Sequence, residues 1–313
     1  MSTFIFKEDG FKAIFIVLPL LATLGFTGVM AWSANYFYKK RKCISSQKHW
    51  SLDKTDFQFD DNNQFSTSKY FNGAFPKAYK NTRNSSGKYK NCGVFVKEIY
   101  CSELNIIKNY DLITELMKRV GGKNENVNFL IGVLERPGNL QLIQLQCSNG
   151  SLFDVLETNP MKIMDNFEFK LHVLLDVARG MNYLHSTLCI PHTNLKTSNC
   201  LVDGRWTVKV SDFEPAVIRD QLEEDESDKE RFNAQQLWTA PELLQSTRRT
   251  KSPSVLFRCD TYSFAMLSCH VLTKSLPFCH EKTSFSFPEI ISRVKESTEP
   301  SFRPQVHTLI SSL

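Results

Sequence analysis

The sequence predicts an α+β fold of two lobes, a small strand-rich lobe followed by a larger helical one, with a membrane-spanning helix in front. Three observations predict it. Residues 13–34 form an uncharged apolar run, and residues 74–100 alternate between apolar and polar side chains. After Gly150 the apolar residues recur instead with the period of an α-helix.

Composition and charge exclude several protein classes. The chain has 313 residues, of which 42% are hydrophobic and 23% charged. These values are typical of globular proteins and exclude collagen, a long coiled coil and wholesale disorder. The formal charge of +5 comes from residues 1–50, which hold seven bases and two acids, so the remainder is balanced. We therefore expect no nucleic-acid partner.

The nine cysteines are odd in number and form no C-x-x-C pair. This pattern argues against a disulfide framework and against a zinc site. We expect reduced thiols that serve as small buried hydrophobes in a cytosolic domain.

The apolar run of 22 residues at 13–34 would reach about 33 Å as a helix, enough to cross a bilayer. The basic residues 39–42 follow it, which predicts that the C-terminal side faces the cytoplasm. The alternative is a cleaved signal peptide, because residues 31–33 read small-x-small. The apolar run is long for that alternative, and its basic cluster lies on the wrong side.

We expect four parts: a short extracytoplasmic N-terminus (1–12), a transmembrane helix (13–34), a juxtamembrane connector (35–70) and a two-lobed domain (71–313). A dozen residues are too few to fold, so no ligand-binding ectodomain is expected in this chain.

The two-lobed domain is expected to contain the following elements. The first lobe has a hairpin turn at 81–91, a strand at 92–100, a helix at 110–120 and strands at 129–134 and 140–145. In that helix, Leu112, Leu116 and Val120 share one face, with Glu115 near its edge. The second lobe has helices at 151–157, 167–185 and 264–272, and a solvated acidic loop at 223–228.

Short motifs in the second lobe follow one another in a fixed order. They are H-T-N-L-K-T-S-N at 192–199, D-F-E at 212–214, A-P-E at 240–242, D-T-Y-S-F at 260–264 and R-P at 303–304. Protein kinases carry H-R-D-L-x-x-x-N, D-F-G and A-P-E in this order. In the first lobe, V-F-V-K at 94–97 resembles the kinase V-A-I-K, and Glu115 the glutamate of the following helix. Residues 70–313 thus resemble a protein kinase, which implies the bilobal protein-kinase-like fold.

The residues within and around these motifs resemble the kinase-homology domain of receptor guanylyl cyclases. The matching stretches are G-S-L at 150–152, G-M-N-Y-L-H-S at 180–186, N-L-K-T-S-N-C-L-V-D at 194–203 and L-W-T-A-P-E-L-L at 237–244. The resemblance implies a single-pass membrane pseudokinase that forms a homodimer, or a heterodimer with a receptor guanylyl cyclase-like protein, and so modulates signalling. The cyclase domain of that family is not expected in this chain, and neither is its chemistry.

The catalytic machinery of a kinase is altered at several positions. Asn194 stands where the catalytic aspartate would be, and a carboxamide is no base near neutral pH; such a base is worth about 10²–10⁴ in rate. Thr193 replaces the preceding arginine, and Glu214-Pro215 replace the flexible glycine of D-F-G. Residues 65–92 hold no G-x-G-x-x-G loop. We therefore expect no catalytic residue and an inactive kinase homologue.

Four residues of the kinase nucleotide site survive: Lys97, Glu115, Asn199 and Asp212. The resemblance implies that Lys97 contacts the phosphates of ATP, that Glu115 orients Lys97, and that Asn199 and Asp212 hold Mg²⁺. The alternative is that Lys97 and Glu115 only pin the helix while Asp212 bonds backbone amides. ATP and Mg²⁺ are thus expected to bind weakly or not at all.

The residues expected to maintain the architecture are complete. His192 and Phe213, with Leu116, would form an apolar stack between the lobes, and Asp260 would bond the backbone of 192–199. A buried pair of Glu242 with Arg303 would anchor the large lobe.

Two other functions stay open. One is a weakly active protein kinase that uses an unconventional base. The other is a truncated receptor-cyclase-like product with no specific activity.

Overall fold

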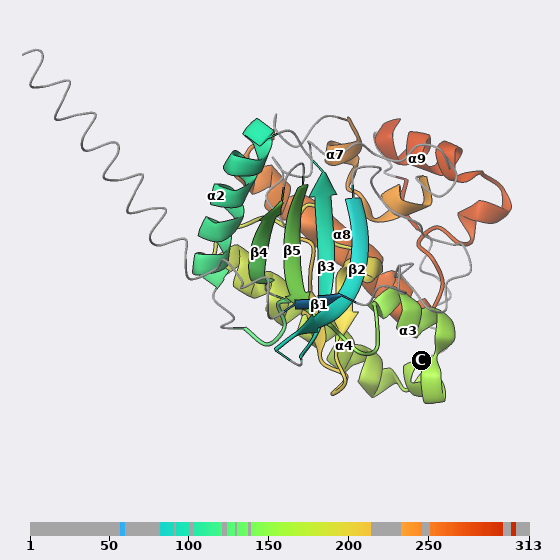
Figure 1. Cartoon of the computed structure of the whole chain (residues 1–313). Coiled ribbons are helices and arrows are strands. Elements are labelled where there is room, and N and C mark those ends of the chain that lie inside the picture. Colours follow the sequence, from blue (N-terminus) through green and yellow to red (C-terminus); the bar gives the residue numbers. More distant parts are fainter. Residues whose placement is uncertain are drawn as a thin grey trace, which may run out of the picture. The chain divides into compact units, whose positions relative to one another are not determined.

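Figure 1 shows the structure, a computed structural model. It describes residues 57–59, 82–90, 92–100, 103–120, 124–128, 130–136, 139–213, 233–245, 251–296 and 302–304. All of them belong to one compact unit, Leu52–Leu313. The predicted membrane-spanning helix 13–34 and acidic loop 223–228 lie outside the described residues. Within the described ranges, no helix combines the length and the apolar character needed to cross a bilayer.

A five-stranded antiparallel sheet forms the first part of this unit, in the order β1-β2-β3-β5-β4 (Figure 1). The strands are β1 (Phe57–Phe59), β2 (Thr82–Tyr89), β3 (Cys92–Tyr100), β4 (Leu130–Arg136) and β5 (Asn139–Leu145). In β3, Val94 and Val96 are fully buried, while Phe95 and Lys97 face the other side and are partly exposed. The alternation that predicted β3 is therefore the alternation of its two faces.

The predicted hairpin turn at 81–91 is wrong, because Thr82–Tyr89 form strand β2. Each residue of β2 pairs with a residue of β3. The ladder hydrogen bonds of a neighbouring strand override the weak strand propensity of Asn, Ser and Gly. The turn itself is shorter, at Lys90, whose φ is 47°.

Helix α2 (Glu103–Val120) packs against β4 and β5 and begins before the predicted residue 110. Among residues 110–120 of this helix, the buried apolar side chains are Ile113, Leu116, Met117 and Val120, which recur at helical spacing. Leu112, predicted on the buried face, is instead 37% exposed. The buried face is thus rotated from the predicted one, and Ile113 takes the place of Leu112.

The second part of the unit is helical, so the predicted division into strand-rich and helical parts is confirmed. Its helices are α3 (Leu152–Thr158), α4 (Phe167–Asn182), α7 (Pro241–Gln245), α8 (Pro253–Thr273) and α9 (Phe287–Glu296). Helix α3 begins with a capping box in which Ser151 and Asp154 cap each other's backbone N–H groups. Helix α8 starts well before the predicted residue 264, with Pro253 in its first turn, where proline is tolerated.

The seven described cysteines are free. Cys200 and Cys259 are buried, as expected of small hydrophobes, but Cys92 and Cys189 are exposed. Burial raises the pKa of the Cys259 thiol to about 11, so this thiol is a poor nucleophile.

A small antiparallel hairpin of β6 (Cys200–Val202) and β7 (Val208–Val210) is tied to the segment that precedes β4. The backbone N–H of Asn128 donates to Val210 O, and that of Val210 donates to Asn126 O, both at 2.8 Å. These bonds fix where the chain goes after β7, and therefore position Asp212.

Candidate functional site

The candidate site forms where the chain enters β6 and leaves β7. In the antiparallel hairpin Cys200 pairs with Val210, so the residues before β6 and after β7 meet at the same end. The backbone N–H of Ser211 donates to Asn199 O at 2.9 Å. The structure thereby brings together segment 192–199 and Asp212, as the motifs predict.

Asp260 of α8 holds the backbone of this segment. Its carboxylate accepts the N–H of His192 at 2.7 Å and the N–H of Thr193 at 2.6 Å, and it lies 2.8 Å from Nε2 of His185. The Asp260 side chain is fully buried. A carboxylate can accept all three bonds at once, which explains why an acid is tolerated there.

His192 is fully buried and links the segment to the chain after β7. Its Nδ1 accepts the N–H of Asn194 at 3.3 Å, so the ring proton lies on Nε2, which donates to Ser211 O at 2.9 Å. This arrangement describes a neutral imidazole that orients both segments.

Two residues of the site have left-handed backbone conformations, Thr193 with φ 57° and Asp212 with φ 59°. Such conformations cost about 1–3 kcal/mol each outside glycine and persist only where the surroundings impose them. Here Asp260 holds Thr193, and Lys97 holds Asp212. At these two positions the strain is therefore opposed by specific side-chain hydrogen bonds.

Lys97 of β3 donates from Nζ to Oδ1 of Asp212 at 3.1 Å. This ion pair connects the sheet to the segment after β7. Burial favours a raised pKa for Asp212, but the charge and hydrogen bond of Lys97, helped by the charge of Lys196, hold the pKa of this carboxyl below its ordinary value. Asp212 is therefore ionised at neutral pH.

Glu115, expected to orient Lys97, lies on the exposed side of α2. The residues next to it that face inward are Thr114 and Leu116. Lys97 forms an ion pair with Asp212. The structure thus brings together three of the four expected nucleotide residues and leaves Glu115 at the surface.

Asn194 and Asn199 are held together through the backbone. The Asn199 amide donates from Nδ2 to Asn194 O at 2.7 Å. That bond uses the side-chain nitrogen of Asn199. The other side-chain atom, Oδ1, is an oxygen of the kind that can ligate a cation.

Lys196 is a site residue that the sequence interpretation missed. It is 9% exposed, and its Nζ donates to Oε1 of Gln235 at 3.2 Å. It also contributes to the lowered pKa of Asp212. The signal available in the sequence was its position inside the motif H-T-N-L-K-T-S-N. Lysine is rarely buried unless it is paired, and Lys196 is buried here.

The residues present fit a magnesium–phosphate group. Asp212 supplies a carboxylate and Asn199 an amide oxygen, the hard oxygen donors that Mg²⁺ prefers. Lys97 and Lys196 supply positive charge beside them. Residues 60–81, 214 and 215 lie outside the described part, so the expected absence of a phosphate-covering loop and the Glu214-Pro215 change stay predictions.

The predicted buried pair of Glu242 with Arg303 is wrong, because both side chains are exposed. The Arg303 guanidinium lies 5.1 Å from the centroid of the Tyr262 ring and donates to Phe302 O at 2.9 Å. An arginine on an aromatic face keeps part of its hydration and avoids the desolvation cost of a buried ion pair.

The apolar residues expected between the two parts are buried. Phe213 and Leu116 are each 7% exposed and belong to one hydrophobic cluster, which also includes Val210 and Leu195. The segment after β7 is thus anchored by an aromatic ring as well as by Lys97.

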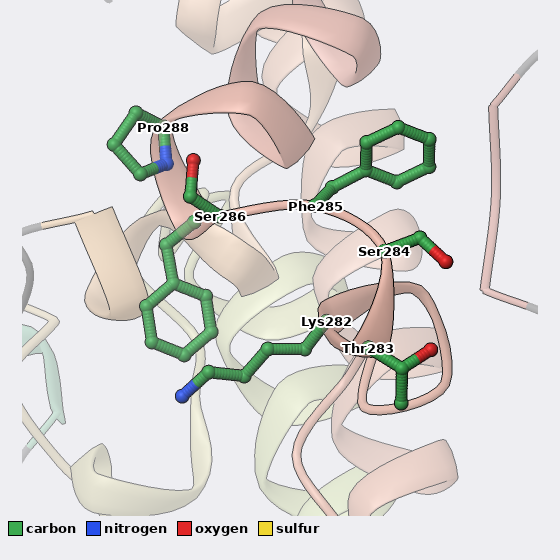
Figure 2. A pocket seen from close by; sticks show the side chains of 7 residues that line it. Lys282, Thr283, Ser284, Phe285, Ser286 and Pro288 are labelled. Carbon is green, nitrogen blue, oxygen red and sulfur yellow. The ribbon is translucent and has the colours of Figure 1, made fainter.

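Figure 2 shows a separate hollow of about 650 Å³ at the start of α9. It is lined by residues 282–288. Lys282 extends over the Phe287 ring, with Nζ 4.1 Å from its centroid. None of the residues expected to bind nucleotide lines this hollow.

Comparison with known proteins agrees with the motifs. Residues 67–312 match the family model of protein tyrosine and serine/threonine kinases. Human retinal guanylyl cyclase 2 is 34% identical over 237 residues, which cover 74% of this chain and 20% of that protein. The Drosophila melanogaster receptor-type guanylate cyclase Gyc76C is 30% identical over 235 residues (73% and 14%). Rat atrial natriuretic peptide receptor 2 is 29% identical over 222 residues (71% and 20%). The chain spans a fifth or less of the length of these relatives.

Proposed function

Because the chain belongs to the protein tyrosine and serine/threonine kinase family, we propose that it is a membrane-anchored pseudokinase, a kinase-like domain that regulates a partner. The observation that carries this proposal is Asn194. It occupies the position of the kinase aspartate that accepts the proton of the substrate hydroxyl. A carboxamide can orient a hydroxyl but cannot take its proton at neutral pH.

The retained residues support nucleotide binding without transfer. Lys97 would contact the phosphates, and Asn199 and Asp212 would hold Mg²⁺. The phosphates of bound MgATP would offer Lys97 another anionic partner in place of Asp212. Asp212, 3.1 Å from Lys97, would compete with the nucleotide phosphates for the lysine ammonium group, which supports weak binding.

The regulated partner is proposed from the relatives. They are receptor guanylyl cyclases by name, and this chain is homologous to them over about seven-tenths of its length. We therefore propose that the chain pairs with itself or with a receptor guanylyl cyclase-like protein and alters its output. The apolar run 13–34 would anchor it, with the kinase-like domain in the cytoplasm.

Thermal unfolding of the full chain in detergent micelles tests the nucleotide site. MgATP is expected to raise the unfolding midpoint, because a ligand of the folded state stabilises it by RT ln(1 + [L]/Kd). The Lys97→Met variant is expected to lose this rise, and Lys118→Met, at an exposed lysine of α2, to keep it. If millimolar MgATP leaves the wild-type midpoint unchanged, Lys97 and Asp212 have a structural role only.

Co-expression tests the regulatory role. The full chain is expressed with human retinal guanylyl cyclase 2, and cyclic GMP production is compared with that of cells expressing the cyclase and an unrelated single-pass protein. The proposal expects a difference at equal cyclase levels. Equal production at every expression ratio would contradict regulation of this cyclase.

A further inference from the structure

Three buried polar side chains meet where the sheet contacts the segment that follows β7. They belong to Gln144 of β5, Asn128 and Ser211, which are 4%, 3% and 2% exposed. The Oε1 atom of Gln144 accepts a hydrogen bond from Nδ2 of Asn128 at 3.2 Å and a longer one from the hydroxyl of Ser211 at 3.4 Å. None of these three side chains has a role in the site described above.

Gln144 lies on the same face of the sheet as Lys97. In the ladder between β3 and β5 it is paired with Phe95, two residues before Lys97. Paired residues share a face of an antiparallel sheet, and so do residues two apart along a strand. Figure 1 shows β3 and β5 side by side. From this face Gln144 contacts Ser211 and Lys97 contacts Asp212, so the sheet holds two consecutive residues of the segment.

Ser211 uses all of its polar groups. Its N–H donates to Asn199 O at 2.9 Å, its carbonyl accepts from Nε2 of His192 at 2.9 Å, and its hydroxyl donates to Gln144. Of these three partners, Gln144 is the one that belongs to the sheet. The next residue is Asp212, whose φ of 59° persists only where neighbouring groups impose it. A shift of Ser211 would therefore move both residues that are expected to hold Mg²⁺.

We propose that Gln144 is a positioning residue for the metal ligands Asn199 and Asp212. Asn128 fixes the carboxamide of Gln144, and Oε1 of Gln144 then fixes Ser211 between the two ligands. Groups that orient metal ligands in this way typically change metal affinity 10–100-fold when they are removed. The inference rests on the proposed function and deepens it, because it concerns the Mg²⁺ of bound MgATP.

The chemistry of the side chain suits this role. A carboxamide supplies an acceptor for both donors without adding a charge. A carboxylate at position 144 would also accept both bonds, but it would add a negative charge beside the residue that precedes Asp212. Methionine has a similar length and only a weak acceptor, so it would leave the buried hydroxyl of Ser211 poorly satisfied.

Nucleotide binding with and without metal tests the proposal. The full chain in detergent micelles is titrated with ATP, once with Mg²⁺ and once with excess EDTA, and the rise of the unfolding midpoint gives a dissociation constant for each condition. Wild type is expected to bind more tightly with Mg²⁺. Gln144→Met is expected to lower this advantage about tenfold, toward none, and to leave the constant in EDTA unchanged. A purely structural role would instead weaken binding equally in both conditions.

The same strand supplies the matched control. Gln141 of β5 is 2% exposed, lies on the other face of the sheet by strand alternation, and donates from Nε2 to Oε1 of Glu98 at 2.6 Å. Gln141→Met makes the same substitution at similar burial and is expected to keep the wild-type advantage of Mg²⁺.

A smaller change removes the same contact from the other side. Ser211→Ala deletes one hydroxyl and does not depend on how methionine packs. It is expected to lower the advantage of Mg²⁺ as well, and the double variant with Gln144→Met is expected to lose less than the sum of the two single losses. Cooperative unfolding without nucleotide confirms that each variant is folded.

Three outcomes would overturn the inference and leave nucleotide binding intact. They are a wild type that binds ATP equally with and without Mg²⁺, variants at positions 144 and 211 that keep the wild-type advantage, and variants that weaken binding equally in both conditions. A wild-type midpoint that ATP does not raise in either condition would refute nucleotide binding itself, and this inference with it. The cyclic GMP measurement decides the regulatory role separately.

Discussion

A single buried carboxylate orders the centre of the site. Asp260 lies within hydrogen-bond distance of two backbone N–H groups, of His192 and Thr193, and of the His185 ring. Thr193 has a positive φ, which the bond from its N–H to Asp260 helps to hold. The position of Asn194 therefore depends on Asp260, although the two are far apart in sequence.

Asp260→Asn is expected to lower the free energy of unfolding by about 2–4 kcal/mol, because an amide sets its own N–H groups against the donors that the carboxylate accepted. Urea denaturation measures this loss. Glu125→Gln, at an exposed position before β4, serves as control and is expected to change stability by less than about 0.5 kcal/mol. Equal stability of the two variants would contradict the anchoring role of Asp260.

His270 of α8 is a second buried polar residue beneath the site. Its Nδ1 lies 3.1 Å from Oγ1 of Thr197, and its ring packs against those of Phe153 and Trp238. Among the described residues its Nε2 has no hydrogen-bond partner. Burial lowers the pKa of His270 to about 4, so the ring is neutral in the folded protein at physiological pH.

This lowered pKa predicts an acid-sensitive fold. Because the unfolded chain binds the His270 proton near pH 6.5, the contribution of the neutral ring is complete above that pH. It is lost as the pH falls from 6.5 toward 4, by about 3 kcal/mol in total. Asp212, whose pKa is also lowered, adds a further loss only in the more acidic carboxylate range.

Unfolding free energies measured by urea denaturation from pH 7 to pH 4 test this expectation. In His270→Phe the decline over this range should become shallower, whereas in His172→Gln, at an exposed histidine of α4, it should persist. A wild-type profile that is flat between pH 6.5 and 4 would refute the assignment.

At the scale of elements, α4 depends on one glycine. A Cβ added to Gly180 would lie 2.4 Å from Asn126 O and 2.8 Å from Cγ2 of Val210. Asn126 O already accepts the N–H of Val210 at 2.8 Å, so it cannot retreat without breaking the tie to β7. The close packing of α4 on this segment therefore positions the chain that leads to Asp212.

Gly180→Ala is expected to destabilise the fold by about 1–3 kcal/mol, although alanine favours helices over glycine by about 1 kcal/mol. Asn182→Ala, an exposed site on the same helix, shows the propensity effect alone and is expected to be neutral or mildly stabilising. Differential scanning calorimetry compares the two. A Gly180→Ala variant as stable as Asn182→Ala would show that the contact can relax.

Elements with strong local patterns were predictable, and those defined by their neighbours were not. Strand β3 alternates clearly, and its predicted bounds agree with the structure. Strand β2, rich in Asn, Ser and Gly, becomes a strand through its pairing with β3, which no local pattern reveals. The rotation of α2 likewise depends on packing against β4 and β5. The local pattern therefore placed Leu112 on the buried face, although it is exposed, and put Glu115 near the edge of that face.

In the candidate site, too, features set by local motifs were predictable and those set by neighbouring elements were not. The order of the motifs predicted that segment 192–199, Asp212 and Asp260 come together, because one fold joins them. Lys97 forms its ion pair with Asp212 and not with Glu115 because of the orientation of α2, which is set by tertiary packing. The exposure of Arg303 could not be predicted either, since the Tyr262 ring competes with Glu242 for the guanidinium.

At the scale of the whole described unit, three hydrogen bonds join the strand-rich part and α2 to the helical part. Lys97 bonds Asp212, the Arg119 guanidinium donates to Leu188 O, and the Tyr183 hydroxyl donates to Val120 O. In the proposed function, the change at Asn194 abolishes transfer, because the kinase reaction uses a carboxylate at that position.

Phosphoryl transfer by the full chain tests this account most directly. Purified protein is incubated with Mg²⁺ and γ-labelled ATP, with and without a generic protein substrate, beside the Asp212→Ala variant, which removes the Mg²⁺ carboxylate. We expect the wild type to incorporate no more label than Asp212→Ala. Labelling by the wild type that disappears in Asp212→Ala would show a working kinase and contradict it.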